Sequence, residues 1–469
     1  MRELPHFMRR HRKTFIHLAV SAIGIACGAF WFLSNLGLPV YSRGIMCCDS
    51  MQFLWLSTQE IGSLIYHLSE RTFGYPLYLA VFQWLYSPAP QEVALASAFT
   101  TQFILSVIGS TVLFFGFRST GLKVPLICYA LLLAHPALAG IAAIPLTDSL
   151  GSSLASAFIG VVALLCASQR HLWAKCLALG FFAGTILSVR PPSTPFIIIW
   201  TALLLPLVAW GAFVQSRSVI TTTQALCIAA TCYAIGFLPV GGHLLNNCYT
   251  AHKTLCVIDP GLARAPLASS LELNYQYSRA WGSVDPVKSW EWHFTEDAVL
   301  QNCAFSREDP MNSLKECYSG NISRLPKHLL HRTVGLFDYR HLNPYAALET
   351  SNAEYWILRT FSAVGILGLI SGIALVLCHL CAGSLQRYGY LLLPLSYFAV
   401  QVNLHTENRY LLSAVPSLFL LGAATLSGRL FKRGWIQVMC LCLSAIVLTY
   451  AYYLVSLWDE LSIQLTGSR

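Results

Sequence analysis

Three carboxylates, Asp49, Asp148 and Glu407, lie at the ends of different hydrophobic segments of this chain, far apart in sequence. A charged side chain close to a membrane core is costly and usually functional. The distribution of basic residues, described below, places all three at the same, non-cytoplasmic membrane face. A carboxylate in that position can act as a general base towards an acceptor hydroxyl or amine. The three residues therefore predict a polar active site at the outer end of a helix bundle.

The segments that hold these carboxylates also allow simpler interpretations. Asp49, in a Cys-Cys-Asp-Ser-Met segment, and Asp148, in a Pro-Leu-Thr-Asp-Ser segment, each stand near the start of an expected helix and could be its N-cap. The segment from His405 to Tyr410 differs, because six polar or aromatic residues in one tight loop are harder to explain by capping. We expect this loop to bind substrate through His405, Glu407, Arg409 and Tyr410.

Two arginines stand close to the same face. Arg71 precedes a short aromatic and apolar stretch, and Arg190 precedes two prolines that separate two hydrophobic segments. A guanidinium group holds a phosphate well because it can donate two parallel hydrogen bonds. The alternative is that Arg71 only extends to lipid headgroups and that Arg190 only marks a turn with a headgroup contact. Both remain candidates for substrate binding.

The composition indicates the elements that must position these residues. The chain has 469 residues, of which 55% are hydrophobic and only 11% charged, whereas soluble domains have about 25% charged residues. The pattern predicts an all-α, polytopic integral membrane protein with about eleven transmembrane helices. We interpret the first hydrophobic run as a retained helix rather than a cleaved signal peptide, because it is too long for a signal and no convincing cleavage site follows. The expected spans are 14–36, 93–117, 122–143, 149–168, 172–189, 194–213, 222–245, 357–380, 387–402, 409–428 and 434–456.

The basic residues predict the orientation. With the N-terminus in the cytoplasm, the short cytoplasmic segments carry fourteen lysines and arginines and the short outer loops carry four. Such an excess marks the cytoplasmic side. The net charge of +9 is therefore attributed to topology, and we expect no nucleic-acid partner.

Three parts of the chain are predicted. An N-terminal transmembrane catalytic module spans 1–245, an extracytoplasmic cap spans 246–356, and 357–469 adds the C-terminal transmembrane helices. Within the first part, the outer loop 37–92 contains two expected juxtamembrane helices, 50–69 and 74–86. The cap holds 12 of the 21 acidic residues and an Asn321-Ile322-Ser323 triplet that would accept a glycan only in a eukaryotic secretory setting. Six cysteines are predicted to face the oxidising side, where disulfides can form, namely Cys47, Cys48, Cys248, Cys256, Cys303 and Cys317.

Several of these motifs resemble those of the GT-C superfamily of membrane glycosyltransferases, which includes the protein O-mannosyltransferases and the aminoarabinose transferase of lipid A. Asp49 and the two juxtamembrane helices resemble the first outer loop of that family, and the segment from Arg71 through Gly74-Tyr75-Pro76 is similar to sequences common in bacterial members. Pro145 to Leu150 resembles the second acidic site. Glu407-Asn408-Arg409-Tyr410, followed by Pro416, resembles the late arginine–tyrosine motif. The chain departs from the protein mannosyltransferases in having one aspartate, rather than an acidic pair, in the first loop.

The resemblance implies transfer of a sugar from a polyprenyl-phosphate donor to a glycolipid, polysaccharide or protein acceptor. Asp49 would be the general base, with inversion at the anomeric carbon, and Asp148 a second catalytic carboxylate. Arg71, Tyr75, Arg190, His405, Glu407, Arg409 and Tyr410 would bind substrate. No cofactor is required, although the outer carboxylates could hold a divalent cation. The implied location is a bacterial inner membrane.

A transporter or flippase of a lipid-linked or anionic substrate is the main alternative. Alternating access would require polar residues through the membrane and at both faces. The candidate residues gather at one face only, and the chain shows no internal repeat. A non-catalytic scaffold is a third interpretation, which replacement of Asp49 by Asn would distinguish from an enzyme.

Overall fold

The structure is a computed structural model. It describes residues 4–36, 48–59, 73–190, 194–216, 218–251, 268, 271, 300, 303–306, 308–337, 352–404, 411–428, 430–431 and 434–466.

The elements of the described residues are all helices, which confirms the predicted fold class at the level of secondary structure. They are α1 (Leu4–Leu36), α2 (Cys48–Ser57), α4 (Gly74–Leu85), α5 (Gln91–Ser119), α6 (Leu126–Leu133), α7 (Pro136–Ile141), α8 (Thr147–Ala167), α9 (Leu172–Val189), α10 (Thr194–Ser216), α11 (Val219–Ala251), α13 (Pro310–Gly320), α14 (Leu325–Leu336), α15 (Asn352–Cys381), α16 (Leu385–Tyr388), the 3-10 helix η5 (Gly389–Leu391), α17 (Leu392–Leu404), α18 (Val415–Leu426) and α19 (Gly434–Thr466).

Eight of these helices are long and apolar enough to cross a membrane. They include stretches of α1, α5, α8, α9, α10, α11, α15 and α19. Many of their large apolar side chains are exposed on the surface of the protein, as expected where a helix faces lipid rather than water. The described helices thus agree with an integral membrane protein.

Three of the eleven predicted spans differ from this set. The 122–143 span is divided into α6 and α7 at His135, which is extended (ψ 113°) and precedes Pro136. A residue before proline disfavours the helical region, and proline donates no main-chain hydrogen bond, so the helix is interrupted there. The 387–402 span is built from α16, η5 and α17, and within 409–428 the described helix is only the twelve-residue α18.

Small residues allow the central helices to approach closely. A Cβ at Gly116 of α5 would lie 2.4 Å from the carbonyl oxygen of Gly160 of α8, and one at Gly368 of α15 would lie 1.7 Å from that of Leu418 of α18. Larger side chains would push these backbones apart. The contacts fix α5 against α8 and α15 against α18.

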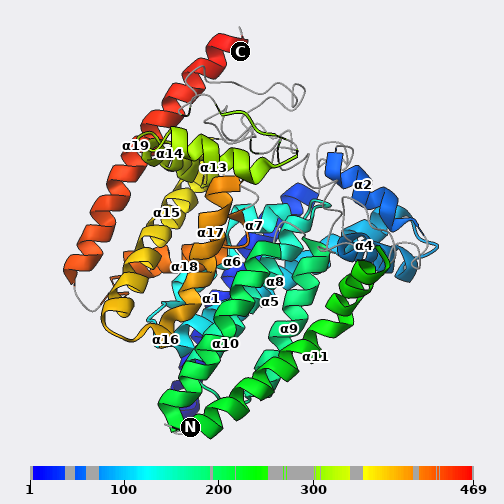
Figure 1. The fold of residues 1–469 in the computed structure, drawn as a ribbon, viewed down its shortest axis with the longest axis vertical. Coiled ribbons are helices and arrows are strands. Elements are labelled where there is room, and N and C mark those ends of the chain that lie inside the picture. Colours follow the sequence, from blue (N-terminus) through cyan, green and yellow to red (C-terminus); the bar gives the residue numbers. More distant parts are fainter. Residues whose placement is uncertain are drawn as a thin grey trace.

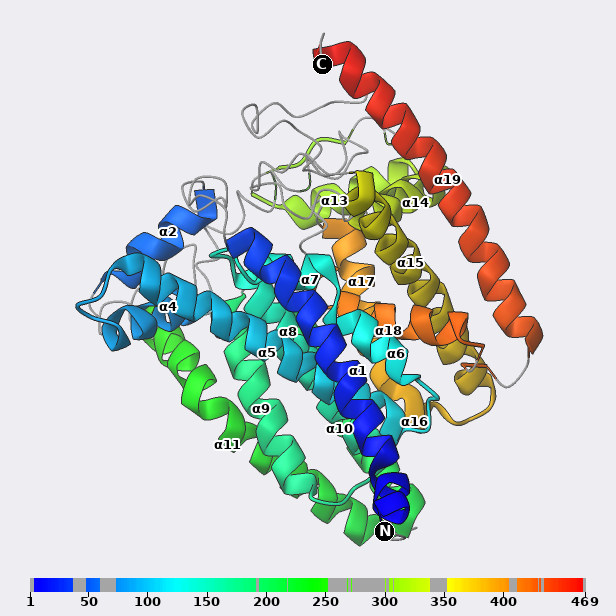
Figure 2. The ribbon, with the colours of Figure 1, turned by 180° about the vertical axis from the view of Figure 1, so that it is seen from behind.

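The two ends of the bundle carry different elements. The start of α1 and the short α16 lie at one end, whereas α13, α14 and the end of α19 lie at the other (Figures 1 and 2). Helices α2 and α4 are also displaced towards the end that carries α13 and α14. Residues at this second end are therefore the ones to compare with the predicted outer site.

Candidate functional site

A buried ion pair joins two of the predicted site residues. Asp148 lies in the first turn of α8, and Arg190 directly follows the last residue of α9, where Nη1 of Arg190 donates to Oδ1 of Asp148. Only 3% of Asp148 and 2% of Arg190 are exposed. Consecutive antiparallel helices bring the start of one beside the end of the next, so residues 42 positions apart meet. Burial of an ionised pair is costly, which makes this position a candidate functional site.

Two glycines allow close packing around the Asp148–Arg190 pair. A Cβ at Gly151, one turn after Asp148, would lie 3.0 Å from Cδ of Arg190, so the arginine chain packs directly over the α8 backbone. A Cβ at Gly74 would lie 2.6 Å from the carbonyl carbon and oxygen of Ser188. The start of α4 is thereby packed against the last turn of α9, two residues before Arg190.

Tyr75 is brought into the same region by this contact. Its side chain is fully buried, and its ring packs edge-on against Phe53 of α2 at 5.2 Å between centroids. Burial raises the pKa of Tyr75 well above its usual value, and the nearby Tyr78 and the Asp148 carboxylate raise it further. The Gln102 amide of α5 lies close enough to lower this pKa, although the two groups do not form a hydrogen bond of ordinary geometry. Tyr75 is therefore a neutral phenol within the field of the Asp148 carboxylate.

Several polar atoms in this region are buried without a partner. The Tyr75 hydroxyl, both polar atoms of the Gln102 amide and the Ser149 hydroxyl make no hydrogen bond within the described part of the chain. Buried polar groups are normally paired with protein or water. Beside the Asp148–Arg190 pair, they form a set of donors and acceptors suited to a hydroxyl-rich ligand.

The structure also connects α8 to the flank of the predicted 405–410 loop. Ser152, four residues after Asp148 and hence on the same face of α8, donates from Oγ to the carbonyl oxygen of Leu412 at 2.8 Å. Leu411 and Leu412 are fully buried. The chain that emerges from the 405–410 loop is thus fixed one helical turn from Asp148.

The other flank of that loop is held by the α13–α14 pair. Arg332 of α14 is 5% exposed and its Nε donates to the carbonyl oxygen of Val402, and Tyr318 of α13 donates to Oδ1 of Asn403. Val402 and Asn403 both belong to the last turn of α17. The Val402 carbonyl is among those that have no partner within the helix, whereas the acceptor of Asn403 is its side-chain oxygen. His331 also bonds the hydroxyl of Tyr450 of α19 through Nε2, at 2.6 Å. The α13–α14 pair therefore fixes the end of α17 two residues before the loop begins.

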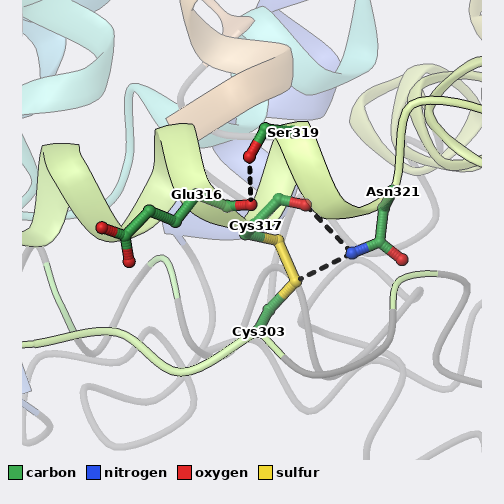
Figure 3. The surroundings of a disulfide bond; sticks show 5 residues. All are labelled: Cys303, Glu316, Cys317, Ser319 and Asn321. Atoms are coloured by element: carbon green, nitrogen blue, oxygen red, sulfur yellow. Dashed lines mark hydrogen bonds between the residues drawn. A yellow bond between two sulfur atoms is a disulfide. The ribbon is translucent and has the colours of Figure 1, made fainter.

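A disulfide stabilises this cap. Cys303 is bonded to Cys317 of α13, and Asn321 donates from Nδ2 to the Cys317 carbonyl oxygen at 2.9 Å and towards the Cys303 sulfur at 3.7 Å (Figure 3). Asn321 is only 7% exposed, so the predicted glycosylation triplet offers no free acceptor amide in the folded protein. A disulfide here agrees with the predicted oxidising side of the membrane. Four cysteines predicted to share that side (Cys47, Cys48, Cys248, Cys256) have side chains outside the described residues.

The structure describes only part of the remaining predicted site residues. Asp49 lies in the first turn of α2, but its side chain is outside the described residues. Arg71, His405, Glu407, Arg409 and Tyr410 are outside them altogether. Among the described residues, no group of three His, Cys, Asp or Glu side chains could hold a metal ion.

Sequence reasoning missed four residues of this region. Gln102 and Ser152 lie within long apolar helices, where a single polar residue in the printed sequence does not reveal its neighbours. Tyr318 and Arg332 were assigned only to a small cap. His328 and Arg332 are four residues apart, so they lie on one face of a helix. This spacing could have indicated a polar face on α14 that is buried against other helices.

Comparison of the chain with protein-family models, with curated proteins and with solved structures finds no match. The function must therefore be argued from the residues themselves.

Proposed function

We propose that the chain is a membrane glycosyltransferase that moves a sugar from a polyprenyl-phosphate donor to an acceptor at the extracytoplasmic face. The observation that carries the proposal is the convergence of Tyr75, Asp148 and Arg190, from three separate sequence motifs, on one buried polar region. Leu412, two residues after the 405–410 motif, accepts a hydrogen bond from Ser152, one turn from Asp148. Such convergence is expected of a site and not of independent helix caps.

The ion pair refines the roles of two residues. Arg190 is neutralised by Asp148, so it is a positioned hydrogen-bond donor rather than a free cation for a phosphate. We assign the donor phosphate to Arg71 and Arg409, and the sugar hydroxyls to Asp148, Arg190, Tyr75 and Glu407. His405 and Tyr410 complete the site in this proposal. Preorganised donors aimed at developing charge lower a barrier most effectively in a dry site.

The proposed reaction needs no cofactor. Asp49 takes the proton from the acceptor hydroxyl or amine, the acceptor atom attacks the anomeric carbon, and the bond from that carbon to the phosphate oxygen breaks. Its electron pair leaves with the polyprenyl phosphate, and the configuration inverts. The sugar is now bonded to a glycolipid, polysaccharide or protein acceptor.

The membrane arrangement of the proposal has eleven crossings. The eight long helices are supplemented by α6–α7, by α16–α17 and by α18. An odd number of crossings agrees with the positions of the two termini at opposite ends of the molecule (Figure 1). The N-terminus is cytoplasmic, the α13–α14 cap is extracytoplasmic, and the membrane is a bacterial inner membrane.

The experiment follows release of the leaving group, which must appear whatever the acceptor is. Membranes that contain the full chain are incubated with a panel of polyprenyl-phosphate sugars, and free polyprenyl phosphate is measured by mass spectrometry. We expect Asp49→Asn to abolish release and Glu92→Gln, an exposed acid at the start of α5, to leave it unchanged. Transbilayer movement of the donor without release would instead identify a transporter.

A further inference from the structure

The region of interest lies at the end of the bundle opposite Asp148. A cavity of about 440 Å³ is lined by His17, Arg118 and Lys123, and by the turn that joins α5 to α6 (residues 121–126). Along α8, Asp148 and Gly160 are twelve residues apart, which corresponds to ~18 Å. Because Gly116 packs against Gly160, Arg118 lies beyond this level. The cavity is therefore separate from the candidate active site.

The cavity is electropositive. No carboxylate belongs to its lining, and neither Arg118 nor Lys123 forms an ion pair with another described residue. Arg118 lies over the Phe114 ring, 5.4 Å from its centroid. A second guanidinium approaches from α16, since Nη2 of Arg387 lies 2.8 Å from the position of a Cβ at Gly121. These cations share a small volume, and no carboxylate of the described residues pairs with Arg118 or Lys123 there.

Main-chain groups also make the cavity favourable for an anion. Leu126 begins α6 and lines the cavity, so the start of that helix is located at it. The N–H groups of Leu126 and Ile127 have no acceptor within the helix, whereas the N–H of Cys128 donates to the Pro125 carbonyl at 3.1 Å. The start of a helix attracts anions such as phosphate. Cationic side chains, a helix start and an open volume within the usual range of ligand sites thus coincide.

The surroundings of the cavity are apolar and face lipid. Phe15 and Leu18 of α1 are 75% and 64% exposed, and Ile127 of α6 is 58% exposed. Within a membrane these side chains contact acyl chains. A ligand that places a phosphate in the cavity can therefore extend its hydrocarbon tails along α1 and α6, which a free phosphate cannot do.

We propose that this cavity binds the phosphate headgroup of an anionic phospholipid, in the leaflet opposite the candidate active site. Basic pockets between transmembrane helices suit such headgroups. The site does not depend on the glycosyltransferase proposal, because none of its residues belongs to that reaction.

The test uses native mass spectrometry of the purified full chain, titrated with phosphatidylglycerol or with zwitterionic phosphatidylcholine. We expect phosphatidylglycerol to bind preferentially and its affinity to fall at least about tenfold in the Arg118→Ala/Lys123→Ala variant. Arg170→Ala removes an exposed cation from the turn between α8 and α9, away from the cavity, and should bind as the wild type does. Arg118→Lys/Lys123→Arg retains both charges and should retain binding.

Three outcomes would overturn the proposal. They are wild-type affinity in the double alanine variant, equal binding of the two lipids, and displacement of the lipid by inorganic phosphate at comparable concentration. The last result would identify a free-anion site. If the alanine variant does not fold, loss of preferential binding in the charge-retaining variant would contradict the proposal in its place.

Discussion

At the scale of single residues, the buried Asp148–Arg190 pair has a direct consequence for stability. Both groups are buried, so removal of one charge leaves the other buried without its ion-pair partner. Such a loss typically costs about 3–5 kcal/mol of stability. Replacement of both charges by neutral amides removes that penalty while retaining similar volume.

We therefore expect Asp148→Asn to lower the thermal stability strongly, and Asp148→Asn/Arg190→Gln to recover most of it. Sugar transfer should be lost in both variants, because the pair positions the substrate. Thermal unfolding measured beside donor cleavage separates the two effects. Restored transfer in the double variant would show that the pair has only a structural role.

Gln102 allows a second test at this scale. Its amide is buried without a hydrogen-bond partner in the described structure, so Gln102→Leu removes no protein contact of that kind and should change stability by less than about 1 kcal/mol. We expect the KM for the sugar donor to rise about tenfold, because the amide is one of the buried polar groups beside the Asp148–Arg190 pair that suit a hydroxyl-rich ligand. Ser110→Ala, at a buried position on α5 further from α4, is the matched control. An unchanged KM in Gln102→Leu would remove this residue from the site.

At the scale of elements, α14 contacts both α17 and α19, through Arg332 and His331. Burial lowers the pKa of His328 to about 3, with Arg332 and His331 adding to the effect. Burial and the nearby Lys327 lower the pKa of His331 to about 4. Both histidines are therefore neutral in the folded protein at neutral pH, whereas an unfolded chain binds their protons below about pH 6.5.

This difference makes the stability of the cap pH-dependent. The unfolded state binds more protons from about pH 6.5 down to about 4 for His331 and about 3 for His328. This contribution to stability is therefore complete above pH 6.5 and is lost as the pH falls through that range. We expect the melting temperature to decrease from pH 7.5 to pH 5, and to decrease less in His328→Gln/His331→Gln. Thermal unfolding at several pH values measures this. Parallel pH profiles for the two proteins would contradict the assignment.

At the scale of the whole molecule, the proposed topology places the two termini on opposite sides of the membrane. We expect an epitope tag at the C-terminus to be accessible to an impermeant protease or antibody in intact spheroplasts. A tag at the N-terminus should become accessible only after permeabilisation. Accessibility of both tags from the same side would require an even number of crossings and would exclude the proposed arrangement.

The sequence predicts most of the bundle because hydropathy and helix length respond to the same physical constraint, the thickness of the membrane. It did not predict the division at His135, although Pro136 carries the signal. The candidate site is different, because its geometry depends on partners distant in sequence. Asp148 and Arg190 could be singled out by residue type, but their pairing follows from antiparallel packing of α8 and α9. The bonds from Ser152 to Leu412 and from Arg332 to Val402 span 260 and 70 residues and have no local signature.

If the chain binds and cleaves a polyprenyl-phosphate sugar, the bound donor should be detectable by native mass spectrometry of the purified protein. Wild-type protein should retain a polyprenyl-phosphate sugar, whose mass identifies the sugar, and Arg71→Ala should lose it. Arg118→Ala, at the opposite end of the bundle, should retain it. Wild-type protein that shows no such ligand even after addition of polyprenyl-phosphate sugars would contradict the account.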